Sequence, residues 1–572
     1  MSKHPPSPPP VTTVMSQDLS NVRLDRAQLA SVADAIKNGL SLESAADELG
    51  LDSQESLLNG LAQSLRLQLI DLSDVEIDEA ILESFPVRLV HRHEFFPLYR
   101  RDGALVVAIT NPFDFQAIDT LSASTGEMVQ PVIADPTQVR ELIKRYLGVG
   151  AETIDGLLAL QRDDDEFTEL ESLTGQDLED AEVAQQASVV HLVNEILEEA
   201  IEARASDIHI EAQEKRIKIR YRIDGVLQKQ STPPEMHQFR AAIISRLKIM
   251  AKLNIAEKRV PQDGRIKLRI KGREIDIRLS IIPMLHGEGV VMRVLDKANL
   301  SFSLKGIGMS EEVYLRFQNL IRMPHGIVLV TGPTGSGKTT TLYSALSEIK
   351  SEETKIITTE DPIEYQLDGI NQIQVHSKVG LTFAASLRSI LRHDPDVVLV
   401  GEIRDLETAE NATQASLTGH MVFSTLHTND SASAFMRLAD MGVEPFLVSS
   451  TVEGVLAQRL VRKLCPECCE PDDRPRSEFP SDFPFDRLSN PIYRPSGCSA
   501  CRGNGYRGRL GIYELLTSSD ELRDLATSRA ATNEIKAVAR RNGMTTLRED
   551  GWEKVLAGVT TVDEVLRVTK MD

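Results

Sequence analysis

The spacing of apolar residues changes several times along the chain, and each change predicts a different kind of element. From Leu24 to about Leu69 the spacing is helical, which predicts a small helical lead-in. Two apolar runs then flank Arg101-Asp102-Gly103 and predict a β-hairpin, and a helical pattern over residues 136–146 closes the domain. Residues 22–148 are therefore expected to form a helical segment plus a compact α+β domain.

Two stretches have no apolar period. Residues 1–21 are rich in Pro, Ser and Thr and predict a disordered tail. Residues 149–187 turn acidic, most clearly in the run of four acids at 163–166, and predict a flexible linker. A linker at this place would separate the N-terminal domain from the rest of the chain.

A clean helical period returns at Ser188, which can act as an N-cap, and opens a second α+β domain over residues 188–300. Two hairpin-like stretches come next, in which apolar residues alternate with mainly basic ones, as in Arg216–Ile223 and Arg273–Leu279. Each of these strands is expected to bury one face and to show cations on the other. On periodicity alone, the simplest interpretation of those cations is a solubilising surface.

Strands alternate with helices from residue 301 to residue 572, the pattern of a parallel α/β sheet, and the first strand leads into a phosphate-binding motif. Residues 332–339 fit GxxxxGK[ST] at every fixed position, between the strand-like run 327–330 and the helix-like run 340–346. The glycines let backbone amides face inward, Lys338 would reach the β- and γ-phosphates of ATP, and the Thr339 hydroxyl would bind Mg²⁺. The context argues against a chance match in a Gly-rich turn. The predicted nucleotide-binding residues are Gly332, Pro333, Thr334, Gly335, Ser336, Gly337, Lys338, Thr339 and Thr340.

Acidic residues come after two later strand-like runs. Residues 356–359 lead into Glu360-Asp361-Pro362-Ile363-Glu364, and residues 397–400 lead into Gly401-Glu402, which resembles a Walker B strand with Gly in the usual Asp position. Ligands of open α/β sheets lie outside the carboxyl ends of the strands, so these acids are placed to order water or Mg²⁺ near the γ-phosphate. A solvated acidic turn is the alternative for the first group.

Two histidines bracket a fourth strand-like run, residues 421–424. His420 precedes the run and His427 comes after it, with several Thr and Asn residues beside the second. Each histidine is either a packed, hydrogen-bonded residue or a phosphate sensor. The sequence leaves both interpretations open.

All five cysteines lie between Cys465 and Cys501. Two CxxC pairs, Cys465 with Cys468 and Cys498 with Cys501, can turn four thiolates toward one tetrahedral Zn²⁺ ion. Four cysteines leave no open position for water, so the metal is expected to be structural. Cys469 is left over as a spare thiol or alternative ligand, and a redox dithiol or metal-free packing are the other interpretations.

Composition narrows the class of protein. A chain of 572 residues is long enough for roughly three or four domains. A net charge of -21 argues against a general nucleic-acid binder, because such proteins need a basic surface, so protein partners are favoured. No apolar run approaches the length needed to span a bilayer, and the N-terminus leads into prolines and not into an apolar signal core. The chain is expected to be cytoplasmic.

The chain carries a phosphate loop, two acidic segments, the segment Ser424–Asn429 and the paired CxxC motifs, in this order. This set and order of motifs resembles that of one family. The chain is similar to the type II secretion ATPases, the GspE/PulE group, with the type IV pilus assembly ATPases (PilB) as near relatives. The likeness runs from about Leu69 to the C-terminus and is densest from Ala205 to Cys501, where Ala205–His209 and Lys258–Arg265 also match family signatures.

The resemblance implies a ring-shaped homo-hexamer of RecA-like domains that hydrolyses ATP. The ring would drive a membrane-embedded platform that assembles a pseudopilus and exports folded proteins. It implies a PAS-like α+β domain before the ATPase core and a zinc subdomain at about 463–508. The N-terminal domain would dock to cytoplasmic segments of inner-membrane proteins, so the chain would lie at the inner membrane only through its partners.

The resemblance also implies roles for individual residues. Glu364, in the Asp box, and Glu402 are the candidates for water activation and Mg²⁺ control, and His427 belongs to the His box. Arg278 and Arg293, from the domain before the ATPase core, would complete the nucleotide site.

Several functional alternatives remain at this point. A pilus extension motor shares these motifs with the pseudopilus motor. A nucleic-acid translocase and an ATP-binding scaffold without hydrolysis are rivals from other classes. Some pilus-type relatives carry a leading module that binds a cyclic dinucleotide, but Arg23-Leu24-Asp25 matches its repeat only loosely, so that ligand is not predicted.

Overall fold

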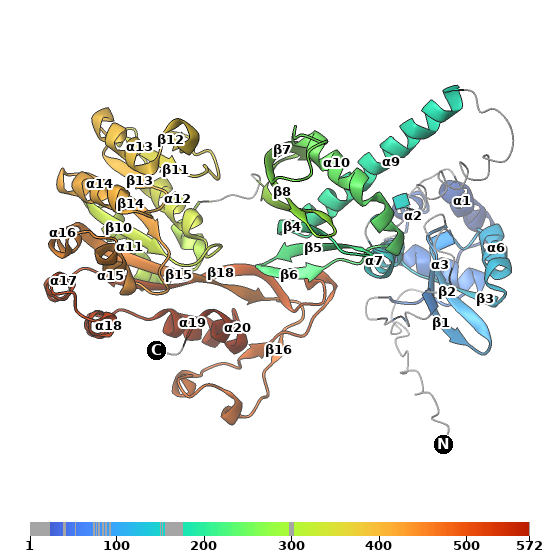
Figure 1. The fold of residues 1–572 in the computed structure, drawn as a ribbon. Helices are drawn as coiled ribbons and strands as arrows, with labels where there is room; N and C mark the ends of the chain where they lie inside the picture. Colours follow the sequence, from blue (N-terminus) through green and yellow to red (C-terminus); the bar gives the residue numbers. More distant parts are fainter. Residues whose placement is uncertain are drawn as a thin grey trace, which may run out of the picture. The chain divides into compact units, whose positions relative to one another are not determined.

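The computed structural model divides the chain into two compact units, Met1–Val294 and Leu295–Asp572 (Figure 1). The residues described are 23–37, 42–51, 53–72, 75, 77, 81–82, 85, 89–90, 93–148, 150, 153–154, 175–296 and 302–570. The predicted tail 1–21 and residues 155–174 of the predicted linker lie outside the described residues.

The first unit begins with the predicted helical lead-in and α+β domain. The helices α1 to α3 come before a three-stranded sheet with the order β1-β2-β3, in which β1 pairs antiparallel with β2 and β2 pairs parallel with β3. The hairpin and the closing helix are confirmed. The elements are α1 (Arg26–Lys37), α2 (Leu42–Glu48), α3 (Gln54–Leu65), β1 (Phe96–Arg101), β2 (Ala104–Ile109), α6 (Phe115–Thr125), β3 (Met128–Ile133) and α7 (Pro136–Leu147).

A six-stranded sheet with the order β6-β5-β4-β9-β8-β7 belongs to the same unit. The helix α9 packs on this sheet through Leu192 and Ile196, and the buried Tyr221 hydroxyl donates to the Ile196 carbonyl at 3.0 Å. The elements are α9 (Gly175–Glu202), β4 (Ala205–Ala212), β5 (Ile217–Ile223), β6 (Val226–Lys229), α10 (Arg240–Met250), β7 (Gln262–Ile270), β8 (Arg273–Met284) and β9 (Gly287–Asp296).

The start of α9 differs from the prediction. The helix begins at Gly175 and not at Ser188, which lies inside it and cannot be its N-cap. The preceding residues are mostly Ala, Glu, Gln and Leu with no Pro, so the helix extends backward from its packed part into the acidic stretch.

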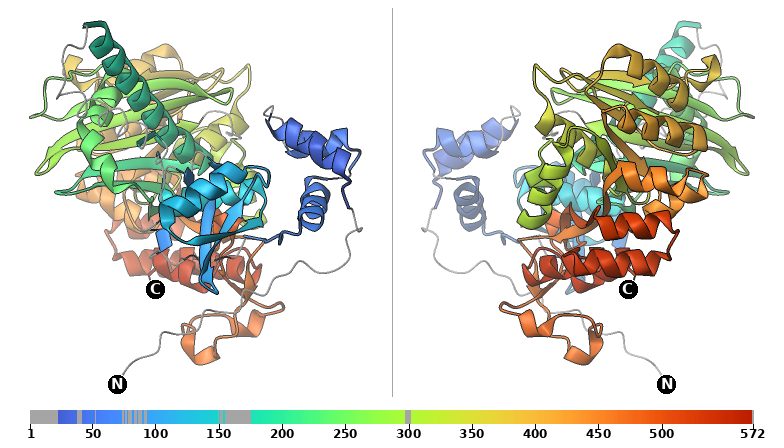
Figure 2. Two further views of the ribbon diagram at one scale, coloured as in Figure 1. Left: turned by 90° about the vertical axis from the view of Figure 1, so that its right-hand side faces the viewer. Right: turned by 90° about the vertical axis from the view of Figure 1, so that its left-hand side faces the viewer.

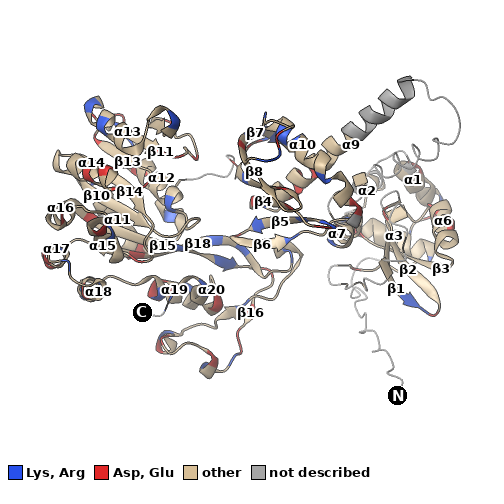
Figure 3. Cartoon of the chain, in the orientation of Figure 1, with Lys and Arg blue, Asp and Glu red and all other residues tan. Residues whose placement is uncertain are grey.

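The alternation predicted for β5 is present, since every second residue is buried. Its cations are half-buried, and its two arginines are ion-paired: Arg220 pairs with Glu211, and Arg222 lies 3.5 Å from Asp207. Figure 3 shows Lys and Arg along β5 and close to β7. The cationic face is therefore partly neutralised by acids of the neighbouring strand β4.

The second unit contains a seven-stranded sheet with the order β12-β11-β13-β14-β10-β15-β18. The six strands from β12 to β15 run parallel, as predicted. The central strands β10, β13 and β14 are mostly apolar and buried along their whole length, because both faces of the sheet are covered there. Ile327 and Leu329 pack into one core, while Val328 and Val330 pack into another on the opposite face. Helices on both sides of the sheet appear in Figure 2.

The four strands predicted at 327–330, 356–359, 397–400 and 421–424 are present, three of them longer by one or two residues, whereas no strand was predicted at β12, β15 or β18. The strands are β10 (Gly326–Thr331), β11 (Ile356–Glu360), β12 (Asn371–Gln374), β13 (Val397–Val400), β14 (Met421–Leu426), β15 (Val452–Leu464) and β18 (Tyr506–Thr517). The helices are α11 (Glu311–Ile321), α12 (Lys338–Ile349), α13 (Phe383–Ile390), α14 (Leu406–Leu417), α15 (Ser433–Asp440), α16 (Pro445–Thr451), α17 (Asp520–Thr527), α18 (Thr532–Arg541), α19 (Leu547–Leu556) and α20 (Val562–Val568).

The last strand, β18, departs from the purely parallel pattern. It pairs antiparallel with β15 from Gly454 opposite Thr517 to Leu464 opposite Tyr506. The cysteine-containing segment is inserted between these two strands and carries the small strands β16 (Glu470–Pro471) and β17 (Tyr493–Arg494). Phe483 packs edge-on against Trp552 of α19 with ring centroids 5.4 Å apart, so an aromatic core holds this insertion to the C-terminal helices.

Candidate nucleotide and metal sites

The phosphate loop lies at the carboxyl end of β10, between the predicted strand and helix. Gly332, Gly335 and Gly337 have φ values of 149°, 79° and 90°, a region that favours glycine. The helix α12 begins at Lys338, directly after the loop, and Thr339 and Thr340 are exposed in its first turn. Free backbone amides and the helix dipole make this end of α12 suited to a phosphate.

Lys338 is bound by the loop itself. Its Nζ donates to the Gly332 carbonyl at 2.8 Å and to the Pro333 carbonyl at 3.2 Å. Burial lowers the pKa of Lys338; the nearby Glu402 carboxylate opposes this shift and Arg459 adds to it. The ammonium group is thus held at the mouth of the loop, in electrostatic contact with the Walker B carboxylate.

Glu402 comes directly after β13 and is bonded on both carboxylate oxygens. One oxygen pairs with Arg404, and the other lies 3.0 Å from Nε2 of His427, at the end of the neighbouring strand β14. Burial raises the pKa of Glu402, but the bonds from Arg404 and His427 outweigh it and the net pKa is lowered. The structure therefore brings Glu402 and His427 together beside Lys338 and keeps the carboxylate ionised.

The two glutamates of the Asp box are in different environments. Glu360 ends β11 and is buried; the Tyr343 hydroxyl of α12 donates to one of its oxygens, and Thr358 at 2.5 Å and Gln372 at 3.1 Å donate to the other. Glu364 is half-buried in the next loop, after the cis peptide Asp361–Pro362. Glu360 thus ties α12 to the Asp box and leaves Glu364 as the catalytic candidate of this pair.

The network around Tyr343 also reaches the loop that carries Glu364. Burial, then the Glu360 charge and hydrogen bond, raise the pKa of Tyr343 far above its usual range, while the Tyr365 and Glu364 backbone amides oppose the shift. Tyr343 therefore stays a neutral hydroxyl that donates to Glu360.

The two histidines lie at opposite ends of β14, and this difference bears on how each is interpreted. His420 precedes the strand, at the end opposite the phosphate loop, and its Nδ1 lies 2.9 Å from the Ala415 carbonyl and 3.1 Å from the Thr418 hydroxyl. The packed interpretation holds for His420. His427 contacts Glu402, and its role as a phosphate sensor stays a prediction.

Two residues of β15 complete the surroundings of the loop, and no motif predicted them. Gln458 is 1% exposed, and its side-chain amide forms hydrogen bonds with Ser336 of the loop and with Thr341 of α12. Arg459 donates to the Asn429 carbonyl at 3.0 Å and side-chain oxygen at 3.2 Å, which ties the loop after the His box to β15. A parallel neighbour of the phosphate-loop strand must contribute side chains at its carboxyl end, but periodicity does not say which later strand that will be.

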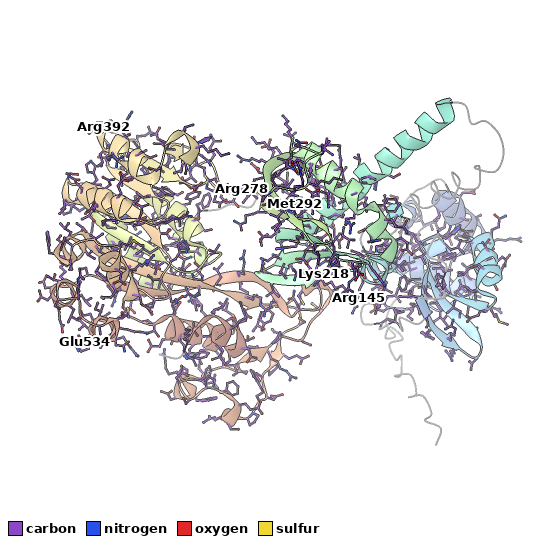
Figure 4. All side chains as sticks on the ribbon, viewed as in Figure 1. Arg145, Lys218, Arg278, Met292, Arg392 and Glu534 are labelled. Carbon is purple, nitrogen blue, oxygen red and sulfur yellow. The ribbon has the colours of Figure 1, made fainter. Side chains whose placement is uncertain are left out.

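Arg278 and Arg293 lie in the first unit, on β8 and β9. Arg278 is half-buried opposite Arg265, and Arg293 is 52% exposed with its Nε 3.2 Å from Asp207. Figure 4 labels Arg278 on β8 and Met292, the neighbour of Arg293, on β9. Their predicted reach to a phosphate stays a prediction.

The four predicted zinc ligands come together. The sulfur atoms of Cys465, Cys468, Cys498 and Cys501 all lie within 4.8 Å of one another. Three of the sulfur pairs are 3.9, 3.7 and 3.7 Å apart, which matches the roughly 3.8 Å edge of a tetrahedron with Zn–S bonds of about 2.3 Å. Cys469 is not part of this cluster. The donor set fits a structural Zn²⁺ site.

Backbone amides support the thiolates. The amides of Cys498 and Gly505 each donate to Cys501 Sγ at 3.1 Å, and the Gly497 amide donates to Cys468 Sγ at 3.3 Å. Burial raises the pKa of Cys468 to about 12, whereas at Cys501 the amides outweigh burial and lower the pKa to about 7. The amides of Cys498 and Gly505 therefore favour the thiolate form of Cys501, the form that binds a metal.

Comparison with known proteins gives two domain matches. The family model described as Type II/IV secretion system protein matches residues 182–567, and the MshEN domain model matches residues 65–153. The predicted docking domain therefore includes an MshEN domain, which the loose likeness at Arg23-Leu24-Asp25 did not predict. No helix in the described part of the chain has both the length and the apolarity to cross a membrane.

Individual relatives cover almost the whole chain. Type II secretion system protein E of Xanthomonas campestris is 44% identical over 93% of this chain and 94% of its own length. The type IV pilus assembly ATPase PilB of Myxococcus xanthus is 43% identical over 94% of this chain and 95% of its own length. Among solved structures, the pilus retraction motor PilT with bound ADP is 27% identical over 66% of this chain and 96% of its own, with a TM-score of 0.44.

Proposed function

The chain belongs to the family of type II/IV secretion system proteins, and from that membership we propose that it works as a ring-shaped hexamer that drives a membrane-embedded platform. It is a P-loop ATPase of this family. The observation that carries the function is the convergence of Lys338, Glu402 and His427 at the carboxyl ends of three neighbouring strands.

The site assigns separate tasks to its residues. ATP phosphates would replace the loop carbonyls as partners of Lys338, since a phosphate is the stronger acceptor for an ammonium group. Thr339, exposed in the first turn of α12, would hold Mg²⁺, which would offset the negative charge of the phosphates. Glu402 would orient water at the metal, and Glu364 would activate the water that attacks the γ-phosphate.

Arg278 and Arg293 supply the remaining positive charge in this proposal. They lie on a different unit from the phosphate loop, so they reach the nucleotide only after the units dock, within one chain or between chains. A guanidinium stabilises the charge that develops on the transferred phosphate, which makes hydrolysis depend on assembly. The half-exposed Arg293 needs only to exchange Asp207 for phosphate.

Two roles known in this family, pseudopilus assembly and pilus extension, are compatible with the nucleotide site described above. We propose that the motor assembles a pseudopilus for type II secretion, with pilus extension as the alternative, because relatives named for each role align over 93% and 94% of the chain at 44% and 43% identity. Its partners would be inner-membrane platform proteins and cytoplasmic segments of the same machinery, bound through the N-terminal domain, so the chain would be cytoplasmic and peripheral at that membrane. Zn²⁺ would hold the inserted segment together.

The test measures phosphate release by the pure full-length chain. Specific activity is expected to rise with protein concentration, because free chains must associate before arginines reach the nucleotide. Arg278→Ala and Lys338→Ala chains, each inactive alone, should recover partial activity when mixed if an arginine crosses a subunit boundary. Activity independent of concentration, with no recovery on mixing, would refute assembly of the site between chains. DNA-stimulated hydrolysis would favour the translocase instead.

A further inference from the structure

Gln458 lies level with the start of the phosphate loop. The last residue pair of β10 and β15 joins Thr331 to Ala457, so the next residues, Gly332 and Gln458, lie side by side. The two backbones are so close that a Cβ placed on Gly332 would lie 2.6 Å from the Gln458 carbonyl oxygen. Gly332 is therefore required for this close approach as well as for its φ angle.

The Gln458 side chain bridges two parts of the site. Its Nε2 donates to the Ser336 carbonyl at 2.6 Å, and its Oε1 accepts from the Thr341 hydroxyl of α12 at 2.8 Å. A carbonyl can only accept, so the amide orientation is determined by its partners. The side chains of Gln458 and Thr341 are each 1% exposed, which makes the two hydrogen bonds hard to replace with water.

The opposite strand keeps Gln458 in place. Tyr513 is its partner on β18, is 1% exposed, and donates its hydroxyl to the Ile307 carbonyl at 3.0 Å. The Gln458 amide therefore extends toward the loop from a strand paired on both edges, and its position is set by the sheet.

The bond to Ser336 has a consequence for the next amide. In a trans peptide the C=O and the next N–H point in opposite directions. With the Ser336 carbonyl directed at Gln458, the Gly337 N–H points away from β15. Backbone N–H groups of a phosphate loop bind the phosphates, so a reversed Ser336–Gly337 peptide would present an oxygen to the phosphate in place of a donor.

Glycine at 337 makes such a reversal easy, because its φ of 90° shows that it already uses conformations closed to other residues. A Cβ on Gly337 would also lie 3.1 Å from Gln458 Nε2, so the site cannot restrict this peptide with a bulkier residue. We propose that Gln458 is a positioning residue that holds the Ser336–Gly337 peptide with its N–H available to the nucleotide phosphates. This inference rests on the proposed function only in that ATP binds the loop.

The experiment compares the dissociation constant of Mg-ATP for full-length variants with their melting temperatures. Gln458→Glu keeps the volume but replaces the donor with an acceptor that repels the Ser336 carbonyl, and it should weaken binding by about 10- to 100-fold. Gln458→Met removes the donor without repulsion and should fall between Gln458→Glu and wild type. If Gln458→Glu does not fold, Gln458→Met still tests the proposal.

Thr341→Val is the matched control. It removes the other hydrogen bond of the same amide and leaves Gln458 Oε1 buried without its donor, so it should lower the melting temperature as the Gln458 variants do. The bond to Ser336 stays, so affinity should change by less than about threefold.

If Thr341→Val loses as much ATP affinity as the Gln458 variants do for the same fall in melting temperature, Gln458 has only a packing role. That result would overturn the proposal. Near wild-type affinity in both Gln458 variants would do the same. A wild-type chain that binds ATP without hydrolysing it would refute the motor function and leave this comparison intact.

Discussion

Tyr343→Phe tests whether the buried network behind the phosphate loop holds α12 in place. The change removes one hydroxyl from a residue that is 1% exposed, and that hydroxyl donates to Glu360, which is 5% exposed. Thr358 and Gln372 both donate to Glu360 Oε1, so among the described residues Tyr343 is the side-chain donor to Oε2. The variant thus leaves a buried carboxylate oxygen without that donor.

The magnitude can be worked out from these donors. A hydrogen bond to a charged group contributes about 1.5–3 kcal/mol, and loss of a donor to a buried oxygen lies at the upper end, so we expect a loss of about 2–3 kcal/mol in unfolding free energy. For a domain of this size the melting temperature should fall by about 5–10 °C. Hydrolysis should fall as well, because the Tyr343 hydroxyl also contacts the backbone of the loop carrying Glu364.

Tyr314→Phe is the matched control in the same unit. The Tyr314 hydroxyl donates to Glu348 at 3.1 Å, but the Glu348 side chain is 20% exposed and Gln318 also donates to it at 2.5 Å. Water and Gln318 can compensate there, so the loss in unfolding free energy should be clearly smaller than for Tyr343→Phe. Denaturant unfolding of both variants decides the matter, and equal losses for Tyr343→Phe and Tyr314→Phe would refute the reasoning.

Two further changes test the chemistry and the metal. Glu402→Gln should keep ATP bound and lower hydrolysis by about 10²- to 10³-fold, and turnover equal to wild type in a phosphate-release assay would exclude Glu402 from catalysis. Because the folded-state pKa of Glu402 is lowered, the stability it contributes is fully present above its ordinary pKa of 4.5 and is lost as pH falls through the lowered folded value. The difference in stability between wild type and Glu402→Gln should therefore shrink as pH falls below about 4.5. Cys498→Ser should release Zn²⁺ and unfold the inserted segment while Cys469→Ser should not, and zinc analysis showing equal loss in both would contradict the four-ligand set.

The sequence predicted those parts of the site whose residues are contiguous. The phosphate loop supplies its own amides, lysine and glycines within eight positions, and each CxxC pair brings two ligands to one turn, so spacing alone identifies them. The strands β10, β11, β13 and β14 were predictable for a similar reason, since burial on both faces of a sheet requires continuous apolar runs, whereas β12 and β15 are more polar and were not predicted.

The rest depends on pairing between distant segments. Gln458 has no motif around it, and its role appears only when β15 is placed beside β10. Tyr343 fits the helical pattern of a core residue, and nothing in the pattern shows that its hydroxyl finds Glu360. The direction of β18 is not encoded in its periodicity either, because parallel and antiparallel strands share the same two-residue repeat.

The order of strands in the sheet has a consequence for synthesis of the protein. The phosphate loop comes directly after β10, yet one edge of its strand pairs with β14 and the other with β15, which leaves the ribosome more than a hundred residues later. A nascent chain that has emerged only as far as α16 carries the complete loop without the strand that positions it. Long-range pairing of this kind is slow to form, so the domain gains a working nucleotide site late in its folding. A chain released only as far as α16 therefore lacks Gln458 and Arg459, two of the residues that surround the phosphate loop.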